Sequence, residues 1–284
     1  MIEATHNLFK LGIIKNVGNI CKKILNVTRQ YFYKKVKQKL NQNNDAQVIL
    51  ALIKDIHSEH PSYGCIKIYK ELTKALDGFN ISIGRDKAIS LIKSNKMSVG
   101  KLRKHPYFRP SIVHLENDNL LFKTQINRVN QVWLSDITFV PLKNNHLVRV
   151  AFVMDYWSRK ILNFEIGNHS DIVKNCLSKS LLLYGKPEVF HSDRGIEFKA
   201  KKVVDQLTMN NIKISLSRKA TPTDNGIMER TIGIVKNELK IAYSSINYDE
   251  LEQNLTRVVQ YFNNSRIHMS LNFKTPLSVF NGEQ

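Results

Sequence analysis

Cysteine is scarce in this chain of 284 residues, which contains only Cys21, Cys65 and Cys176. An odd number of cysteines at wide spacing argues against a disulfide framework and favours a reducing compartment. His57 and His60 precede Cys65 with part of the spacing of a zinc site. No second cysteine follows Cys65 within a few residues, so a set of four zinc ligands lacks a member.

Long apolar runs are also missing. The apolar residues near the start of the chain are interrupted by lysines, at Lys10, Lys15, Lys22 and Lys23. No signal-peptide core or membrane span is therefore predicted. The chain nevertheless has 42% hydrophobic residues, enough to bury a sizeable core. We expect a cytoplasmic protein, associated with the nucleoid, that contains two or three structural units.

Acidic residues are few beside the basic ones. The chain has 24 Asp and Glu against 43 Lys and Arg, a formal net charge of +19. Such an excess is typical of proteins that bind nucleic acid, although an AT-rich genome also raises the lysine content. Residues 1–110 hold 21 basic and 7 acidic residues, whereas the remainder holds 22 and 17. This asymmetry predicts a binding segment ahead of a more evenly charged domain.

The first 127 residues divide by pattern into three parts. Residues 1–40 carry nine Lys and Arg among aromatic residues, which suits either contact with a phosphate backbone or a solvated helix that docks its aromatics. Residues 41–104 contain three short helical runs that predict a helix-turn-helix-like DNA-binding module, although plain interaction domains share this pattern. Residues 105–127 have no sustained period and are expected to form a linker.

From residue 128 onward the pattern becomes that of an α/β domain. Three runs of β-branched and aromatic residues are followed by alternating helical and strand-like segments, in the order βββαβαβα. This order predicts a mixed sheet with flanking helices over residues 128–245, and such sheets commonly place functional groups at strand ends. Residues 246–284 are expected to form a C-terminal helical tail.

Three acidic residues in this domain occupy positions that need an explanation. Asp136 lies among apolar residues inside the first predicted strand, where an unpaired carboxylate is costly. Asp193 ends the fourth strand and is either a turn former before Gly195 or a carboxylate held for chemistry. Glu229 borders the apolar stripe of the last long helix, which places it within reach of the sheet edge.

Convergence of these three carboxylates would have a chemical consequence. Without cations they repel one another, and their pKa values rise. Divalent ions relieve that repulsion, and hard oxygen donors with open positions suit Mg²⁺ or Mn²⁺. Two such ions can activate a nucleophile and stabilise the leaving oxygen of a phosphoryl displacement.

The motifs around these residues resemble those of a known family. WLSDIT, HSDRG and TPTDNGIMERTIGIVKNELK are similar to the Asp-Asp-Glu motifs of bacterial insertion-sequence transposases with a retroviral-integrase-like catalytic core. The 35 residues between Asp193 and Glu229, and a basic residue seven positions later at Lys236, are typical of that group. The tail YFNNSRIHMSLNFKTPLSVF resembles the family's ending. Residues 47–104 resemble the helical region ahead of the core in the second-frame product of two-frame insertion sequences.

The resemblance implies an RNase H-like fold in which Asp136, Asp193 and Glu229 hold two Mg²⁺ or Mn²⁺ ions. The implied activity is strand cleavage and strand transfer at the ends of an insertion sequence. The implied partners are the terminal inverted repeats, target DNA, further copies of the chain on DNA, and a first-frame DNA-binding partner or fusion. The cations expected to bind DNA lie near the motifs: Lys236, Arg218, Lys219 and Lys240. The chain departs from the family where Arg230 and Thr231 replace a bulkier aromatic after the glutamate, which bears on substrate detail.

Some nearby polar residues have two interpretations each. His191 either positions water or phosphate or serves packing, and Glu197 either assists the site or does not. Asp155 is interpreted as structural, in a pair with Arg159. Two rival functions also stay open: a nuclease of the same fold without strand transfer, and a transposase-derived DNA-binding protein without catalysis. The three intact carboxylates argue against the second, because a binding protein has no need of them.

Overall fold

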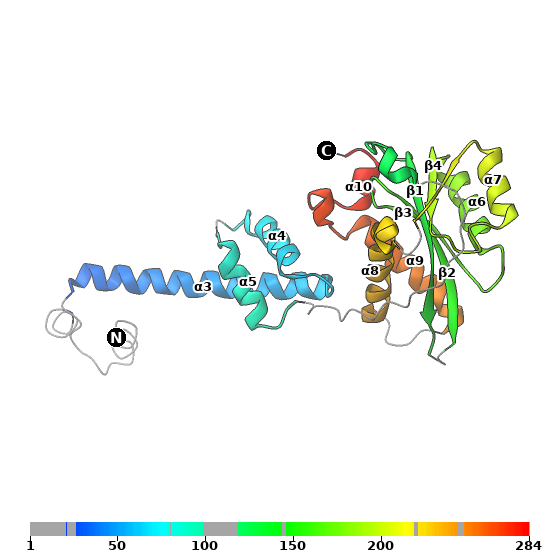
Figure 1. Cartoon of the computed structure of the whole chain (residues 1–284). Coiled ribbons are helices and arrows are strands. Elements are labelled where there is room, and N and C mark those ends of the chain that lie inside the picture. Colours follow the sequence, from blue (N-terminus) through cyan, green and yellow to red (C-terminus); the bar gives the residue numbers. More distant parts are fainter. Residues whose placement is uncertain are drawn as a thin grey trace. The chain divides into compact units, whose positions relative to one another are not determined.

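The computed structural model describes Cys21 and residues 27–79, 81–98, 119–143, 146–218, 221–242 and 247–283 (Figure 1). The chain divides into two compact units, residues 1–100 and 101–284. Lys219 and residues 105–118 of the predicted linker lie outside the described residues. Within the described ranges, no helix combines the length and the apolar character that a membrane span requires.

The described part of the N-terminal unit has three helices, α3 (Arg29–Glu59), α4 (Cys65–Leu76) and α5 (Arg85–Ser94). Helix α3 runs through the boundary predicted at residue 40, because the polar stretch before that point contains no glycine or proline to end a helix. The three helices share one apolar core, made of Ile49, Ile53, Tyr63, Ile68, Leu72, Leu76, Ala88 and Ile92. The three predicted helical segments are therefore present, and they pack together.

The C-terminal unit is built on one mixed sheet of five strands. These are β1 (Val132–Pro141), β2 (Leu147–Asp155), β3 (Ile161–Ile166), β4 (Val189–Ser192) and β5 (Lys213–Leu216). The spatial order is β3-β2-β1-β4-β5. Strands β1, β2 and β3 are antiparallel neighbours, whereas β4 is parallel to β1 and β5 is parallel to β4. This topology confirms the RNase H-like mixed sheet expected from the sequence.

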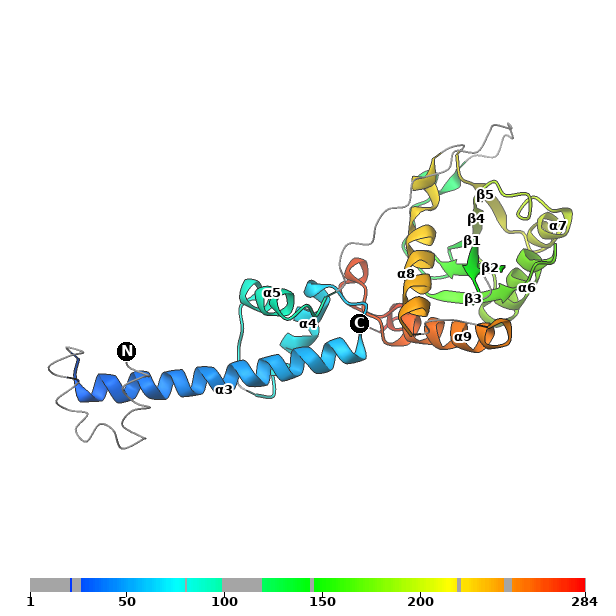
Figure 2. The same ribbon diagram turned by 90° about the horizontal axis from the view of Figure 1, so that it is seen from below.

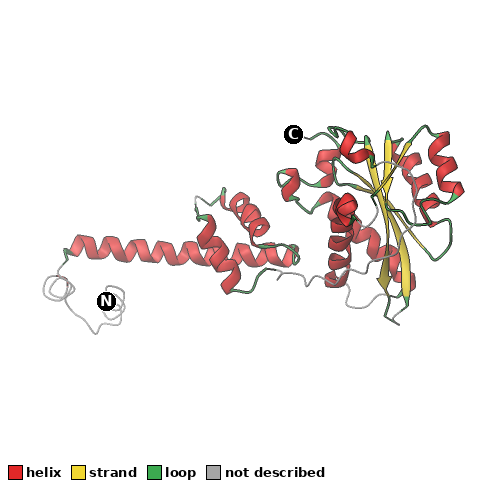
Figure 3. Ribbon diagram, viewed as in Figure 1, coloured by secondary structure: helices red, strands yellow, loops and turns green. Residues whose placement is uncertain are grey.

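Helices cover both faces of this sheet (Figures 1, 2 and 3). Helices α6 (Ile172–Tyr184) and α7 (Lys201–Met209) lie on one face, and α8 (Gly226–Ala242) and α9 (Tyr248–Asn264) lie on the other. Side chains of a strand alternate between faces. Val132 and Leu134 of β1 belong to the core beneath α8 and α9, whereas Trp133 belongs to the core beneath α6 and α7. By the same alternation, Asp136 lies on the face that α8 covers.

Two segments predicted to lie outside this domain belong to its fold. Asn119 is buried, and the 3₁₀ turn η1 (Leu120–Lys123) packs against the core, so residues 119–127 are not a free linker. Helix α9 buries an apolar face made of Leu251, Leu255, Val258 and Phe262, so the predicted C-terminal tail completes the core. The amide of Asn263 accepts from the Ile161 N–H at 3.0 Å and donates to its C=O at 2.9 Å, which joins α9 to β3.

A short last helix, α10 (Pro276–Phe280), follows the 3₁₀ turn η3 (Met269–Leu271). Thr275 caps α10 by accepting a hydrogen bond from the Ser278 N–H at 3.2 Å, and Pro276 suits the first helical turn because its missing N–H has no partner there. Phe280 packs edge-on against Tyr184 of α6, with 5.8 Å between the ring centroids. The Thr-Pro and Phe positions of the tail motif thus have structural roles.

Candidate active site

Asp136 is the best-defined member of the predicted site. It is half-buried on β1, and one of its carboxylate oxygens accepts a hydrogen bond from the Ile137 N–H at 2.8 Å. Burial first, and then the charges of Asp193 and Glu229, raise the pKa of Asp136 to about 7 against the lowering effect of that hydrogen bond. Segments that are far apart in sequence are therefore brought within electrostatic reach of one carboxylate.

Asp193 reaches this site because β4 is parallel to β1 and ends one residue before it. The side chain is exposed, yet partial desolvation at the strand end raises its pKa, and the neighbouring Glu197 adds to the rise. Its Oδ1 accepts from the Gly195 N–H at 2.9 Å. A Cβ atom at position 195 would lie 2.9 Å from the same oxygen, so this turn requires glycine for close approach.

Glu229 lies in the first turn of α8, where the helix dipole stabilises a negative charge. It is half-buried beside the apolar stripe of Met228, Ile232, Val235 and Leu239, which the structure buries as predicted. The fifth stripe position, Ala242, is instead exposed at the helix end. The packing of this stripe on the sheet turns Glu229 toward β1.

Two polar contacts set the direction of α8 along β1. The Asn225 Nδ2 atom donates to the Ser135 carbonyl oxygen at 3.3 Å, just before the helix begins. Further along, the Lys236 Nζ atom lies 3.5 Å from the Thr138 Oγ1 atom. The helix therefore follows β1 in the direction of increasing residue number, with Glu229 between these two contacts.

The donor set fits divalent cations of the hard type. All three side chains are carboxylates, and in the described part of the chain no Lys or Arg forms an ion pair with Asp136. Among the described residues, no group of three His, Cys, Asp or Glu side chains is arranged to hold a metal ion as it stands. Binding of an ion would thus draw the carboxylates closer and relieve their repulsion.

The cations predicted to bind DNA have different surroundings. Lys236 is half-buried on the face of Asp136, and burial lowers its pKa. Lys240 is exposed one turn further along α8. The guanidinium of Arg218 is engaged with Asp224, to which Nη2 donates at 3.0 Å and Nε at 3.1 Å. The contacts of Lys236, Lys240 and Arg218 with DNA stay predictions.

Asp224 is a buried residue that the sequence analysis missed. Besides Arg218, the Asn119 Nδ2 atom donates to it at 2.8 Å, and its pKa is lowered to about 2, chiefly by the hydrogen bond from the Arg218 side chain. In the sequence, Asp224 precedes Asn225 and Gly226 and has the pattern of a turn former. Only its hydrogen bond with Asn119, 105 residues earlier in the chain, distinguishes Asp224 from an ordinary turn residue.

The secondary candidates have structural surroundings. His191 is fully buried between Ser215 (2.8 Å from Nδ1) and Ser217 (3.1 Å from Nε2), and burial lowers its pKa to about 4, so the ring is neutral near pH 7. Asp155 caps the turn after β2, where it accepts from the N–H and the hydroxyl of Ser158 at 2.8 and 2.7 Å. These contacts agree with the packing interpretation of His191 and the structural interpretation of Asp155.

The contacts of Arg159 and Glu197 bear on two further expectations, the pair of Asp155 with Arg159 and a role of Glu197 at the site. The guanidinium of Arg159 lies over the Tyr156 ring, 4.5 Å from its centroid, and attracts Asp155 only through its charge. Glu197 forms an ion pair with Arg149 of β2, at 2.9 Å between Nη1 and Oε1. The pair ties the loop after Asp193 to the sheet, so Glu197 acts on the position of that loop.

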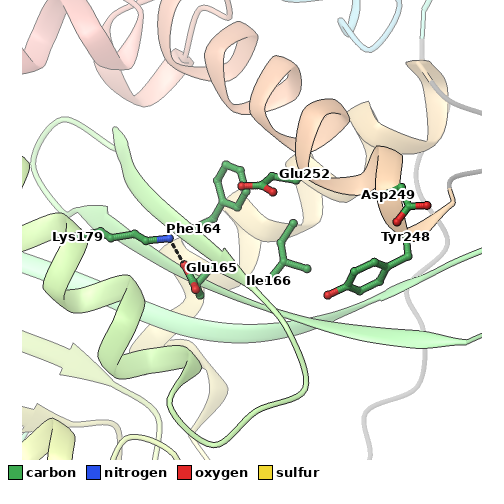
Figure 4. Close-up of a pocket in the computed structure, with 7 residues that line it drawn as sticks. All are labelled: Phe164, Glu165, Ile166, Lys179, Tyr248, Asp249 and Glu252. Atoms are coloured by element: carbon green, nitrogen blue, oxygen red, sulfur yellow. Dashed lines mark hydrogen bonds and ion pairs between the residues drawn. The ribbon is translucent and has the colours of Figure 1, made fainter.

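A separate pocket of about 360 Å³ lies on the outer side of β3 (Figure 4). It is lined by Phe164, Glu165, Ile166, Lys179, Tyr248, Asp249 and Glu252. Lys179 and Glu165 form an ion pair at 2.6 Å, and Asp249 lies in the first turn of α9, where its charge complements the helix dipole. Strand β2 separates β3 from the strand of Asp136, so this pocket is distinct from the carboxylate site.

Comparison with known proteins gives a consistent result. Two family models, both described as integrase core domain, match residues 126–222 and 210–276. The transposase for insertion sequence element IS904 of Lactococcus lactis is 25% identical over 83% of this chain and 94% of its own length. The putative transposase InsK for insertion sequence element IS150 of Escherichia coli is 23% identical over 90% of each chain. The catalytic core domain of HTLV-2 integrase, solved in complex with magnesium, is 20% identical over 54% of this chain and 97% of that one, with a TM-score of 0.45.

Proposed function

Because the chain belongs to the integrase-core family of insertion-sequence transposases, we propose that it cuts DNA at the ends of an insertion sequence and joins those ends to another strand. The observation that supports the proposal is that Asp193, just after β4, and Glu229, in the first turn of α8, both lie within electrostatic reach of the half-buried Asp136, whose pKa is raised to about 7. The buried carboxylate of Asp224 is satisfied by hydrogen bonds instead. Repulsion among the carboxylates around Asp136 costs the folded chain stability, and a pKa perturbed in this way is typical of a functional site.

Asp136, Asp193 and Glu229 are the residues that would hold two Mg²⁺ or Mn²⁺ ions. Bound ions of this kind supply activation of the attacking oxygen and stabilisation of the leaving oxygen. The three carboxylates lie on separate elements: β1, the end of β4 and α8. The geometry of the site therefore depends on how α8 packs on the sheet. A bound cation would favour the ionised form of Asp136, whose pKa is raised to about 7 by burial and by the neighbouring carboxylates.

The chemistry on DNA consists of two displacements at phosphorus. In the first, a water oxygen bonds to phosphorus, the bond to the 3′ oxygen breaks, and a proton leaves the attacking water. In the second, the freed 3′-hydroxyl attacks a phosphodiester of the target and displaces its 3′ oxygen. Neither displacement needs a covalent bond to the protein. Lys236, half-buried beside Thr138, is placed to hold a phosphate of the DNA end.

The proposed DNA partners are the terminal inverted repeats of the element and a target duplex. The 21 basic and 7 acidic residues of the first 110 favour the N-terminal unit as the part that binds the repeats. We expect several copies of the chain to assemble on DNA in the cytoplasm, at the nucleoid. A first-frame DNA-binding protein, as a partner or as a fusion, is the further partner proposed.

The test is an assay of the purified full-length chain on labelled DNA that carries the flanks of its own gene. We expect nicks at the 3′ ends of the element and, with added target duplex, joined products, both only when Mg²⁺ or Mn²⁺ is present. Nicked but never joined DNA would favour the nuclease reading. Binding without either product, at several divalent-ion concentrations, would favour the non-catalytic binding protein.

A separate measurement tests the N-terminal unit. The affinity of the full chain for its terminal repeat should fall steeply with salt, because each neutralised phosphate contributes about −0.9 to the slope of log K against log[salt]. Charge-reversing changes of exposed lysines on α5, such as Lys87→Glu with Lys93→Glu, should make that slope shallower. An unchanged slope would move DNA binding away from this helix.

A further inference from the structure

A buried aspartate lies just ahead of the helix that carries Glu229. Asp224 is 7% exposed and accepts four hydrogen bonds, three of them from Arg218 through its backbone N–H (2.8 Å), Nε (3.1 Å) and Nη2 (3.0 Å). The fourth comes from the Asn119 Nδ2 atom at 2.8 Å. A carboxylate taken out of water is tolerated only when its oxygens are satisfied in this way.

These contacts join three segments at one point. Arg218 follows β5, Asn119 precedes η1, and Asp224 belongs to the 3₁₀ turn η2 (Pro222–Asn225) that leads directly into α8. The next residue, Asn225, is 4% exposed and donates to the Ser135 carbonyl, next to Asp136. The start of α8 is thereby fixed on one side to the sheet and on the other to the chain ahead of β1.

The position of Glu229 depends on this start. Glu229 lies five residues after Asp224, in the first turn of α8, where helix ends are otherwise the least constrained part of a helix. The apolar stripe of α8, from Met228 onward, packs the helix against the sheet, and the polar contacts of Asp224 and Asn225 fix the turn just ahead of it. A displacement on the order of 1 Å at a catalytic group costs as much as a hundredfold in rate.

We propose that Asp224 is a positioning residue: held by Arg218 and Asn119, it fixes the first turn of α8 and so sets where Glu229 meets Asp136. The inference rests on the proposed function, because it concerns the same carboxylate site. It also gives Arg218 a role that does not require contact with DNA. Asp224 itself is buried and fully engaged, so it touches neither DNA nor the reacting atoms.

The experiment compares Asp224→Asn with Asp249→Asn in the full-length chain. Asp249 is the matched control, since it also lies at the start of a helix but is exposed and lies beside the edge strand β3. Strand transfer is measured against concentration of the DNA end, and hydrogen exchange is measured for the amides of residues 224–232. We expect Asp224→Asn to lower the rate at saturating DNA by about ten- to a hundredfold, with the KM for DNA changed less than about threefold and faster exchange confined to this segment.

Arg218→Lys is the second variant, for use if Asp224→Asn does not fold. Lysine keeps the charge and the backbone N–H but cannot form the two side-chain hydrogen bonds of the guanidinium. We expect a smaller fall in the saturated rate, about three- to tenfold by the same reasoning, and an unchanged salt slope of DNA affinity. If Arg218 acted on DNA phosphate instead, Arg218→Gln would make that slope shallower by about 0.9 and raise the KM for DNA.

The outcomes separate the inference from the proposed function. Wild-type rates and wild-type exchange in Asp224→Asn would overturn the positioning role, as would a raised KM for DNA with an unchanged saturated rate. If the wild-type chain showed no strand transfer at all, the proposed function would fail. The exchange measurement would then still decide whether Asp224 holds the first turn of α8.

Discussion

The C-terminal unit has two groups of three carboxylates, one beside β1 and one beside β3, and their surroundings differ. In the first group, Asp193 and Glu229 lie within electrostatic reach of Asp136, which is half-buried on β1 and has a pKa raised to about 7. The second group, Glu165, Asp249 and Glu252, lines the pocket beside β3. There Glu165 is paired with Lys179, and the other two side chains are exposed.

The difference shows how a functional carboxylate cluster can be told from a structural one. Beside β3, Lys179 neutralises Glu165, solvent screens the exposed Asp249 and Glu252, and the dipole of α9 stabilises Asp249. These three charges therefore destabilise the folded chain little. Charges beside β1 are brought together by three elements without a paired cation for Asp136, so the folded chain retains repulsion that an incoming cation would relieve. Both groups contain three carboxylates, and the raised pKa of Asp136 distinguishes the first group from the second.

The largest expected effect is the loss of activity when the first group is neutralised. Removing any one of the proposed metal-holding carboxylates should lower cleavage and strand transfer on the order of 10⁴-fold, while thermal unfolding shows that the protein still folds. The variants are Asp136→Asn, Asp193→Asn and Glu229→Gln, and the matched controls from the pocket are Glu165→Gln, Asp249→Asn and Glu252→Gln. Near-normal Mg²⁺-dependent turnover in any of the first three would remove that residue from the site.

A smaller effect is expected in the pH dependence of stability. The pKa of Asp136 is about 7 in the folded chain, whereas the unfolded chain releases this proton near the ordinary aspartate pKa of 3.8. Raising the pH across this window should therefore destabilise wild type relative to Asp136→Asn, by on the order of 2 kcal/mol once solvent screening is allowed for. Urea unfolding at pH 4.5 and pH 8 measures the difference.

The control for this pH experiment is the metal. Added Mg²⁺ at pH 8 should recover the lost stability of wild type and leave Asp136→Asn unchanged, because only the wild-type site retains the repulsion to be relieved. A free energy difference between the two proteins that stays constant from pH 4.5 to pH 8 would contradict the raised pKa.

The third prediction compares two lysines, one near each group. Lys236→Ala should weaken positioning of the DNA end by about 1–3 kcal/mol, the cost of one charged contact to phosphate, with little change in Mg²⁺ affinity measured by calorimetry. Lys179→Ala, beside the pocket, should leave strand transfer unchanged. Equal rates for Lys236→Ala and wild type at limiting DNA would make Lys236 an ordinary helix lysine. Lost Mg²⁺ affinity would place it closer to the carboxylates than proposed.

The smallest effect is expected from the ion pair of the pocket itself. Lys179 is 58% exposed in its side chain, and a solvent-exposed pair of this kind contributes less than about 1 kcal/mol. A double-mutant cycle with Lys179→Ala and Glu165→Gln, followed by urea unfolding, measures this coupling. A coupling well above 1 kcal/mol would show that the pocket stabilises the fold, and the contrast between the two groups would weaken.

The parts of the fold that the sequence predicted are those with a local signal. The β-branched runs of β1, β2 and β3 and the apolar stripe of α8 follow the period of their secondary structure, and Asp136 stands out because its neighbours are apolar. The first half of α3 lacks an apolar period, so its helical state is decided by propensity and the absence of breakers. The boundary predicted at residue 40 therefore falls inside α3.

Long-range contacts explain the remaining differences. Asn119 and Leu120 have the local pattern of a linker, and only hydrogen bonds to Asp224 and Ser215, about a hundred residues later in the chain, make them part of the domain. The ion pair of Arg266 with Glu238, at 2.9 Å and buried on both sides, joins the end of α9 to α8 in the same way. Such pairs have no spacing rule that a single sequence reveals.

The amide of Asn263 has a consequence for assembly. The side-chain amide has a donor and an acceptor side by side, and it forms one hydrogen bond with the N–H and one with the C=O of Ile161. The backbone of a neighbouring strand would form the same two hydrogen bonds. Because α9 fills that position with a side chain, the outermost strand β3 is closed to a strand from another molecule at this point. A strand from a second copy of the chain could therefore not pair with β3 at Ile161 without displacing this amide.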